Sequence, residues 1–556
     1  MSTPPAWVRF KKEGDSYYEN GKFVEAIRSY DQALKLAHTS VVATFLFLAR
    51  GAARLPFHAY DAALADAKAA LTFPPADKPF NTQHEAALLL AAKADYGLRQ
   101  FRESYRWVQK LITFYPTNDE GLDMLRLCTR RIVEQEQGIY DWDGMWKEAR
   151  RGTTDSDHAD YVGPIEVRSC RDSKCGRGLF VTKDVEPGEL LLVEKAFSAA
   201  FAKERVTPDM PAMGDGVRSK PDEEEEKARE ERKALHTELV TQTIVRFFRN
   251  HSVQRAFLGL YRGPKMDEES DERKDYSQAI QNRIAYNAFA FPSFLPASGF
   301  STTTPSRGIW LKASYINHSC NPTIHRSFIS DVIILRAQTH IARDTEVYID
   351  YTSCLDSVSQ RRKYLSKYGF HCECQRCVSE AGTSQAKLKL REKRVREIET
   401  LKIGEGGVGL GYYHMKTLAI DATYMNAPSV EPRLALVSPL LNLLSAAQME
   451  DMHGFAILLI CRVLRALGWV VADPLYFDIW KWGFFTNEIV VLMTDLALAF
   501  EAKGQLWSRD VAERVAKKCY LIICGEDWSW EEAYEEDGKI EEGTVVDLIK
   551  HGVVVG

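Results

Sequence analysis

The chain lacks an excess of positive charge, and it lacks a late apolar run that is free of charged residues. Its 72 Lys and Arg residues are outnumbered by 77 Asp and Glu residues, which gives a formal net charge of -5. General nucleic-acid binders usually carry a basic excess, so we expect no direct sequence-specific nucleic-acid binding. The most apolar late stretch, 455–471, contains Arg462 and Arg465. It therefore predicts a buried helix and not a membrane span.

The first residues lack the features of a secretory signal. Residues 1–5 contain neither a basic n-region nor an apolar core, so we expect no signal peptide. Cysteine is scarce, with 11 mostly scattered residues in a chain of 556. An odd and scattered set fits a reducing compartment, where clustered cysteines bind metal more often than they form disulfides. We therefore expect an intracellular protein of the nucleus, the cytoplasm or both.

Small residues recur near the N-terminus at the spacing of helical hairpins, as in tetratricopeptide repeats. The matching positions are Gly14, Tyr17, Ala26, Tyr30 and Ala33 in a first copy, Gly51, Ala63, Ala67, Ala70 and Pro75 in a second, and Ser104, Val108, Leu111 and Pro116 in a third. Three copies are about the minimum for a stacked solenoid with a continuous core. We predict helical repeats over 1–135, with a generic helical bundle as the alternative.

Such repeats often bind peptides, so we expect a peptide or protein partner for this region. One subclass grips acidic chaperone tails with a clamp of lysine and asparagine residues. Lys11 matches the clamp lysine, but Asp15 and Ala49 occupy the asparagine positions. An acidic Asp15 would repel a terminal carboxylate. We therefore expect a different peptide partner or a purely structural solenoid.

Residues 136–160 end in a polar stretch and are expected to form a linker. Short strand patterns follow at 165–167, 178–181 and 189–193. The pair Pro187-Gly188 precedes the last of them and predicts a turn, because Pro sets φ and Gly supplies a positive φ. The sequence therefore changes from helical to β-rich near residue 161.

Three runs in the middle of the chain carry the chemical signature. They are NHSC at 317–320, EVYIDY at 346–351 and CECQRC at 372–377. In this order, and within the length of one small domain, they resemble SET-domain protein lysine methyltransferases, especially the SET and MYND-domain branch. The glycine-rich stretch 174–189 is similar to the opening of a SET domain.

The resemblance implies an α+β fold in which a β-rich SET domain lies between two helical regions. The expected domains are the repeats at 1–135, the linker at 136–160, the SET domain at 161–352, a post-SET zinc segment at 353–385 and a helical C-terminal domain at 386–556. We expect the C-terminal domain to wall the substrate cleft.

An insert at 201–285 occupies the place where this branch normally has its zinc-binding MYND module. It contains no cysteine, so no MYND zinc cluster can form there. The part 221–233 is dominated by Glu, Lys and Arg and predicts a solvated helix or loop. We expect any partner binding that MYND serves in that branch to be absent or to fall to the N-terminal repeats.

The run CECQRC holds three thiols within six residues, a density that favours a metal over core packing. Structural zinc sites are usually closed tetrahedra of such ligands. The sequence offers Cys320, Cys354 or His371 as the fourth ligand, and reduced buried cysteines are the alternative interpretation. In SET domains with this pattern the NHSC cysteine is the fourth ligand. The resemblance therefore implies Zn²⁺ held by Cys320, Cys372, Cys374 and Cys377.

The resemblance also implies S-adenosylmethionine as the methyl donor. Asn317 and His318 match the Asn-His pair of the family, and glycine at 176 lets the backbone come close to a ligand. Phe370 matches the aromatic residue that stacks on adenine. A turn asparagine and a core phenylalanine are the alternatives for Asn287 and Phe370. The expected cofactor-binding set is Cys175, Gly176, Arg177, Asn287, Asn317, His318 and Phe370.

Tyr351 matches the catalytic tyrosine of the family. A lysine side chain has a pKa near 10.4 in water, and an apolar channel beside a sulfonium would lower it. The hydroxyl of Tyr351 would then orient the neutral amine. Tyr348 is expected to point to the other face of the strand. The turn at 343–346 has Asp344 where the family has glycine, and Asp tolerates a positive φ.

The sequence thus predicts a protein-lysine N-methyltransferase whose substrate is a protein with an accessible lysine, a histone being one candidate. The alternative is a catalytically inactive interaction scaffold that combines the repeats with the SET fold. A third hypothesis is methyl transfer to an acceptor other than lysine.

Overall fold

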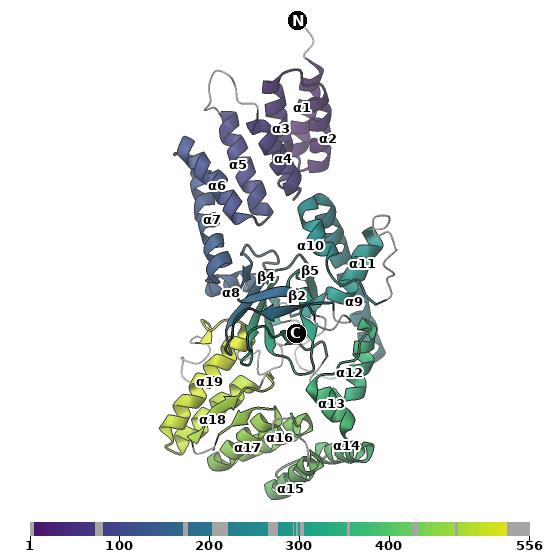
Figure 1. Cartoon of the computed structure of the whole chain (residues 1–556), viewed down its shortest axis with the longest axis vertical. Helices are drawn as coiled ribbons and strands as arrows, with labels where there is room; N and C mark the ends of the chain where they lie inside the picture. Colours follow the sequence, from purple (N-terminus) through teal and green to yellow (C-terminus); the bar gives the residue numbers. More distant parts are fainter. Residues whose placement is uncertain are drawn as a thin grey trace, which may run out of the picture.

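A central region of short strands lies between two helical ends (Figure 1). Helices from the first part of the chain form one end of the long axis, and helices from the last part form the other. This arrangement confirms the predicted α+β class. The computed structural model describes residues 5–72, 82–170, 176–202, 221–264, 276–292, 294–295, 299–300, 305–352, 356–424, 432–472, 476–486 and 488–530.

The N-terminal end is a row of helices in which each packs against the next. Their bounds are α1 (Ala6–Glu19), α2 (Phe23–Lys35), α3 (Ser40–Arg54), α4 (Tyr60–Leu71), α5 (Thr82–Gly97), α6 (Phe101–Phe114) and α7 (Asp119–Gln137). Capping side chains set two of the starts, since Thr39 accepts from the Val42 amide and Asn118 from the Gly121 amide. The succession of helical hairpins confirms the predicted repeat region.

Small residues allow the helices to cross closely, as the repeat pattern requires. A Cβ on Gly14 would lie 2.6 Å from the Tyr30 ring, so α1 and α2 could not approach this closely with a larger residue. Ala26 and Ala33 are fully buried between them. Tyr17 is an exception, because 38% of its surface is exposed and it makes no part of the core. Its predicted role as a helix-contact residue was wrong.

The second and third copies follow the same rule. The buried positions are Gly51, Ala63, Ala67, Ala70, Ser104, Val108 and Leu111. Pro116 follows the end of α6, as expected for a residue that cannot continue a helix. Pro75 lies outside the described residues.

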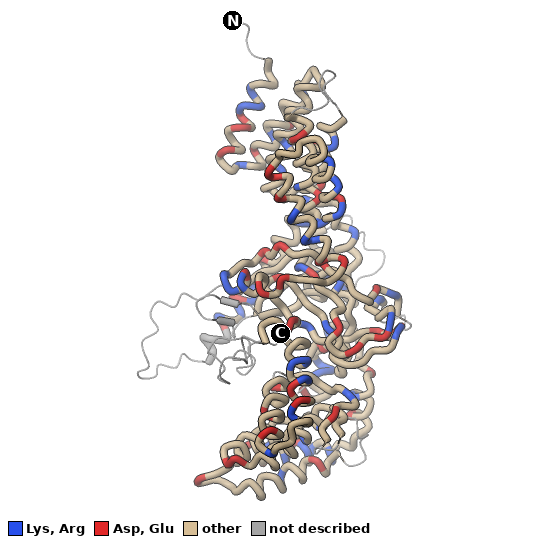
Figure 2. Tube along the Cα trace, turned by 90° about the vertical axis from the view of Figure 1, so that its left-hand side faces the viewer, with Lys and Arg blue, Asp and Glu red and all other residues tan. Residues whose placement is uncertain are grey.

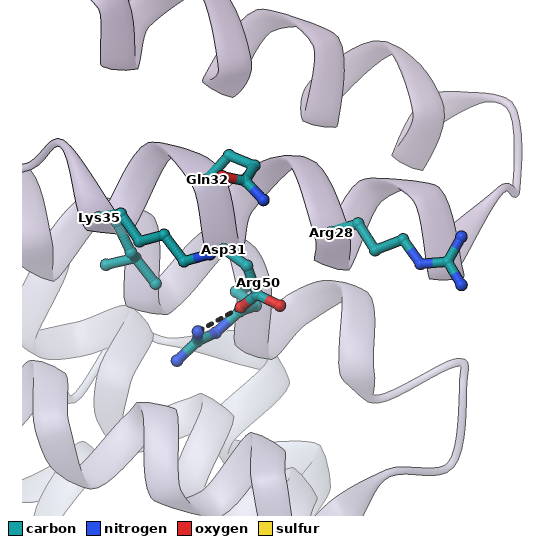
Figure 3. A pocket seen from close by; sticks show the side chains of 6 residues that line it. Arg28, Asp31, Gln32, Lys35 and Arg50 are labelled. Carbon is teal, nitrogen blue, oxygen red and sulfur yellow. Dashed lines mark hydrogen bonds and ion pairs between the residues drawn. The ribbon is translucent and has the colours of Figure 1, made fainter.

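A buried carboxylate ties the first helices together. Asp66 on α4 is 2% exposed and accepts from Arg50 at 2.5 Å and from Arg54 at 2.6 Å, both on α3. Arg50 also pairs with Asp31 on α2 at 2.5 Å, a contact drawn in Figure 3. Two guanidinium groups thus depend on one buried acid for their compensating charge.

The segment 136–160, which the sequence predicts as a linker, is packed structure instead. Helix α7 runs to Gln137, and α8 (Trp142–Arg150) begins where Asp141 caps the Gly144 amide. Trp146 is 4% exposed, and its indole donates to Glu526 at 3.1 Å. Trp and Tyr side chains supply enough apolar surface to dock this segment on the C-terminal helices.

The described strands form six sheets, of which all but the one formed by the last two strands belong to the central region. Their bounds are β1 (Tyr161–Val162), β2 (Ile165–Ser169), β3 (Arg177–Val181), β4 (Leu190–Lys195), β5 (Ser198–Ala200), β6 (Phe289–Phe291), β7 (Phe294–Leu295), β8 (Gly299–Phe300), β9 (Ser306–Ile309), β10 (Asn317–His318), β11 (Ile324–Ile329), β12 (Val332–Ala337), β13 (Tyr348–Ile349), β14 (Val470–Val471) and β15 (Ile479–Lys481).

The largest described sheet has four strands in the order β1-β4-β12-β11, with antiparallel pairing throughout. Every residue of β12 is buried, so both faces of this strand are covered. The remaining sheets pair β2 with β3, β5 with β9 and β6, β7 with β8, β10 with β13 and β14 with β15. The three strands predicted around residues 165 to 193 are confirmed as β2, β3 and β4, with Gly188 at a φ of 91° before the last.

The insert is mainly helical and lies to one side of the strands (Figure 1). It contains α9 (Pro221–Arg249), η2 (His251–Val253), α10 (Gln254–Leu258) and α11 (Tyr276–Asn287). Residues 226–234 of α9 are mostly exposed, as predicted for a solvated charged helix, whereas Leu239 and Phe247 further along are fully buried. The insert therefore has a small apolar core of its own.

The C-terminal end is helical, as the sequence predicts. Its elements are α12 (Val358–Leu365), η4 (Ser366–Tyr368), α13 (Gln375–Gly382), α14 (Gln385–Glu399), α15 (Leu410–Asp421), η5 (Ala422–Tyr424), η6 (Leu434–Leu436), α16 (Val437–Met449), α17 (His453–Ala466), α18 (Ile489–Ala502) and α19 (Leu506–Cys524). Helix α17 is a buried core helix. No helix in the described ranges has the length and apolarity needed to cross a bilayer.

Charges of both signs are interspersed along the chain (Figure 2). Basic and acidic residues alternate over the repeats, the central strands and the C-terminal helices. The distribution accords with the formal net charge of -5.

We expect Asp66→Asn to lower the free energy of unfolding of the N-terminal repeats by about 3 kcal/mol, because two partly buried guanidinium groups lose their shared counter-charge. The midpoint of the first thermal unfolding transition measures the effect. Asp31→Asn is the matched control, because the Asp31 side chain is 40% exposed and its loss should cost at most about 1 kcal/mol. Equal effects of the two variants would contradict the buried-charge explanation.

Candidate functional site

A short parallel strand pair organises the site. Strands β10 and β13 pair in parallel, with Asn317 opposite Tyr348 and His318 opposite Ile349. The pairing continues beyond the strands, since the Ser319 amide donates to Ile349 O at 3.0 Å. Parallel neighbours need a long crossover connection, which here contains β11 and β12. The runs NHSC and EVYIDY therefore meet although they are distant in sequence.

His318 links this strand pair to the tyrosine and to the cysteines. Its Nδ1 accepts from the Tyr351 amide at 3.0 Å, and its Nε2 lies 3.2 Å from Cys320 Sγ. Because a backbone N–H can only donate, the neutral ring must carry its proton on Nε2, which then faces the sulfur. The ring is 8% exposed, so these contacts fix its orientation inside the protein.

Tyr351 is one of the residues that line a large cavity. The hydroxyl donates to Ile316 O at 2.6 Å, and burial raises the pKa of Tyr351 above its usual range. The group therefore stays a neutral hydroxyl at physiological pH. Tyr348 has a different partner, because its hydroxyl donates to Glu346 Oε2 at 2.8 Å. The two tyrosines of this segment thus serve different polar groups.

The cavity has a volume of about 1750 Å³ and lies between the central region and the C-terminal helices. Residues of α14 and α16 form part of its wall, as predicted for the C-terminal domain. Its aromatic lining consists of Tyr286, Phe289, Tyr351, Tyr364, Tyr368, Tyr424 and Phe485. The volume exceeds the range of roughly 300–1,000 Å³ that is usual for small-molecule sites. A polypeptide segment is therefore a suitable occupant.

The glycine-rich stretch lies against Asn317. Gly176 has a φ of 67°, and a Cβ added there would meet no atom within 4 Å, so the space beside it is open. The Arg177 guanidinium lies 4.8 Å from the centre of the Tyr315 ring. The Asn317 side-chain amide donates to Arg177 O at 3.2 Å. Cys175, predicted with this group, lies outside the described residues.

Asn287 and Phe370 approach the same region from two other elements. Asn287 ends α11, is 5% exposed and lines the cavity. Its amide nitrogen donates to Tyr261 O and Arg283 O, both at 2.7 Å. The side-chain nitrogen is therefore used within the protein, where it holds the end of α11 to residue 261. The Phe370 ring lies 6.1 Å from the His318 ring. Both residues are therefore neighbours of the strand pair.

Four cysteine sulfurs converge beside His318. Cys320 Sγ lies 3.8 Å from Cys372 Sγ and 3.5 Å from Cys377 Sγ, and with Cys374 all four lie within 4.8 Å of one another. A tetrahedron with Zn–S bonds of about 2.3 Å has edges of about 3.8 Å, so the donor set fits a structural zinc site. Of the fourth-ligand candidates, the described structure groups Cys320 with the other three. Cys354 lies outside the described residues, and His371 is not part of the group.

The surroundings lower the pKa of two of these thiols, Cys372 and Cys374, and raise that of the other two, Cys320 and Cys377. Hydrogen bonding with Cys320 lowers the pKa of the Cys372 thiol and of the Cys374 thiol. The Arg361 guanidinium donates to Cys377 Sγ at 3.7 Å and to Glu380 at 2.6 Å, and its side chain is 1% exposed. Thiolates are the metal-binding form of cysteine, and a buried cation beside them offsets part of their charge.

Two residues of the site escaped the sequence analysis. Glu346 accepts from the Asn317 amide at 2.6 Å, and the Tyr368 ring lies 5.1 Å from the Tyr351 ring. Glu346 stands two positions before Tyr348 on the same strand segment. Alternation of side chains along a strand could have placed the two on one face. Tyr368 had no such signal, because its position depends on how η4 docks.

The turn before β13 confirms one expectation from the sequence. Asp344 has a φ of 62°, the left-handed conformation that the family obtains with glycine. Its carboxylate accepts from Arg168 at 2.6 Å. The substitution of glycine by aspartate therefore leaves the turn intact.

Comparison with known proteins finds a domain match and several similar proteins for this region. A SET-domain model matches residues 176–352, which include both strands of the parallel pair. A protein of Gibberella zeae named methyltransferase is 27% identical over 94% of this chain and 73% of its own length. The chain therefore contains a SET domain, and the predicted resemblance is confirmed.

Shorter alignments point in the same direction. The histone-lysine N-methyltransferase ASHR1 of Arabidopsis thaliana is 38% identical over 13% of this chain and 15% of its own length. The human protein-lysine N-methyltransferase SMYD4 is 36% identical over 13% of this chain and 10% of its own length. These two alignments thus span only a small part of either relative. The TPR domain of Arabidopsis OM64 aligns with 22% of this chain and 93% of its own at 19% identity and a TM-score of 0.20.

Proposed function

We propose that this protein is an S-adenosylmethionine-dependent protein-lysine N-methyltransferase. The observation that carries the proposal is the parallel pairing of β10 with β13. It brings Asn317 and His318 to Tyr351 beside a cavity large enough for a polypeptide segment. The similarity to methyltransferases, two of them named for lysine, supports the same reaction.

The residues around β10 offer groups that suit the methyl donor. We infer that Gly176, Arg177, Asn317 and His318 hold its amino-acid part, because the described residues leave space beside Gly176 and the Asn317 amide contacts the neighbouring Arg177 carbonyl. Phe370, whose ring lies near His318, offers a π-face on which adenine can stack. Asn287 offers a backbone carbonyl, which accepts from Ser314. Cys175 belongs to the same proposed set of cofactor-binding residues. When bound, S-adenosylmethionine supplies an electrophilic methyl group.

Tyr351 orients the amine of the substrate lysine in this proposal. Its hydroxyl proton is committed to Ile316 O, so the oxygen can accept a hydrogen bond from the amine and direct the nitrogen lone pair. Because its pKa is raised by burial, Tyr351 acts as a neutral hydroxyl and not as a general base. Removal of the lysine from water, together with the positive charge of the sulfonium, would disfavour the charged ammonium and help the lysine to lose its proton.

We propose that Cys320, Cys372, Cys374 and Cys377 bind one structural Zn²⁺. Such an ion would join the end of β10 to the segment before α13 and so stabilise the neighbourhood of His318. We further propose that the repeats end at residue 135, the SET domain spans 161–352, the post-SET segment spans 353–385 and the C-terminal domain follows. Residues 136–160 form a packed connection between the first two.

The N-terminal repeats are the proposed site for a peptide or protein partner. A hollow of about 420 Å³ lies beside Arg28, Gln32 and Lys35 on α2. Figure 3 shows these lining side chains from close by. The lysine of the chaperone-tail clamp is neutralised, since Lys11 Nζ lies 2.7 Å from Asp15 Oδ2. This pairing favours a partner other than an acidic chaperone tail. We propose an intracellular setting, nuclear, cytoplasmic or both.

The activity is tested with radiolabelled S-adenosylmethionine and an array of lysine peptides that includes histone sequences. Transfer to a peptide, with the methyl group located on the lysine nitrogen by mass spectrometry, supports the proposal. Cofactor binding without transfer to any substrate would favour an inactive scaffold. A methyl group on another atom would favour a different acceptor.

Tyr351→Phe should lower kcat about 100-fold or more, because a group that orients the reacting amine is lost. The affinity for S-adenosylmethionine, measured by titration calorimetry, should change less than about threefold. Tyr412→Phe is the control, since Tyr412 is an exposed tyrosine on α15 outside the cavity. Retained kcat in Tyr351→Phe would exclude the proposed role.

Purified protein should contain one zinc ion per chain by inductively coupled plasma mass spectrometry. Cys320→Ser should lose that ion and lower the midpoint of thermal unfolding, because a closed tetrahedral site needs its fourth thiolate. Cys461→Ala, a change at a buried cysteine of α17, should keep the zinc. Full zinc content in Cys320→Ser would assign the fourth ligand elsewhere.

A further inference from the structure

Glu346 is held on both of its carboxylate oxygens at the edge of the strand pair. Its Oε1 accepts from the Asn317 amide nitrogen at 2.6 Å, and its Oε2 accepts from the Tyr348 hydroxyl at 2.8 Å. Tyr348 is the register partner of Asn317 across β10 and β13. The carboxylate therefore has one fixed orientation relative to Asn317.

The Glu346 carboxylate fits beside β3 because residue 178 is a glycine and has no side chain. A Cβ on Gly178 would run into the Glu346 carboxylate and would lie 3.1 Å from the Asn317 amide nitrogen. Gly178 is buried on β3, and its neighbour Arg177 offers the carbonyl that also accepts from Asn317. Strand β3, the strand pair and Glu346 thus form one packed unit.

This unit decides which way the Asn317 amide faces. A carboxylate and a backbone carbonyl can only accept, so both require the amide nitrogen of Asn317 on their side. The amide oxygen must then point the other way. No donor in the described part of the chain reaches that oxygen, and Asn317 is only half-buried. The side chain therefore presents an acceptor that no described donor uses, next to the segment that begins at Gly176 and Arg177.

We propose that Glu346 is a positioning residue that aims the Asn317 amide oxygen at the ammonium group of the bound methyl donor. The inference rests on the proposed function, since it assigns the amino-acid part of S-adenosylmethionine to this place. A fixed acceptor favours an ammonium group and disfavours an acceptor-only group. The Tyr348 hydroxyl holds the other oxygen of Glu346. Tyr348 therefore has a part in cofactor binding and not in catalysis.

Titration calorimetry on the full-length protein with two probes tests this role. S-adenosylhomocysteine carries the ammonium group, whereas methylthioadenosine lacks the amino-acid part. Glu346→Met removes both acceptor oxygens and should weaken S-adenosylhomocysteine about tenfold while leaving methylthioadenosine unchanged. Glu346→Gln keeps one acceptor oxygen, but its amide can pair with the Asn317 amide as acceptor or as donor. The Asn317 oxygen then faces the ligand only part of the time, so the affinity for S-adenosylhomocysteine should fall only about threefold.

Two further variants complete the design. Gly178→Ala should reproduce the selective loss, because the added methyl group displaces the carboxylate. Glu405→Gln removes a charge from an exposed carboxylate and should bind both probes like the wild type. Thermal unfolding of each variant shows whether the fold is intact.

The outcomes separate the two proposals. A selective loss of S-adenosylhomocysteine with an intact fold supports the positioning role. Equal loss of both probes with a lowered midpoint of unfolding would make Glu346 a purely structural residue and overturn it. If the wild type binds both probes and Glu346→Met binds them equally well, the positioning role is overturned too. A wild type that bound neither probe would overturn the proposed function and this inference together.

Discussion

The site depends on a parallel strand pair that is only two residues long on each side. Strands β10 and β13 align Asn317 with Tyr348 and His318 with Ile349. So short a ladder contributes little stability by itself, since few hydrogen bonds offset the entropy of closing the loop between them. Its neighbours must therefore hold it, and the contacts of His318, Glu346 and Cys320 do so from three sides.

The cysteine group is the longest-range of these supports. Cys320 meets Cys372 and Cys377 across 52 and 57 residues of chain. Four sulfurs this close would be a poor apolar core, because their lone pairs and protons need partners. The proposed metal ion would resolve that conflict and join the two segments at the cluster. The buried Arg361 guanidinium, which is also paired with Glu380, places a positive charge beside Cys377 Sγ.

Motif spacing in the sequence was sufficient for much of the fold and the site. The repeats, the strands β2 to β4, the helical C-terminal end and the positive φ of Asp344 follow from local chemistry. Residues 136–160 were misjudged as a linker, because the polar end of that stretch gave no sign that Trp146 docks on Glu526. Tyr17 fits the repeat pattern by position, yet the repeat packs without it.

The amino-acid order by itself determined which side chains were available: the thiols, the Asn-His pair, two tyrosines and the turn residues that end each element. Tertiary structure decided which of them meet. It grouped Cys320 with the other cysteines, gave Tyr351 and Tyr348 different partners, and placed Glu346 against Asn317. The reason is that strand register and crossover connections set distances between residues far apart in sequence, and no local pattern encodes those distances.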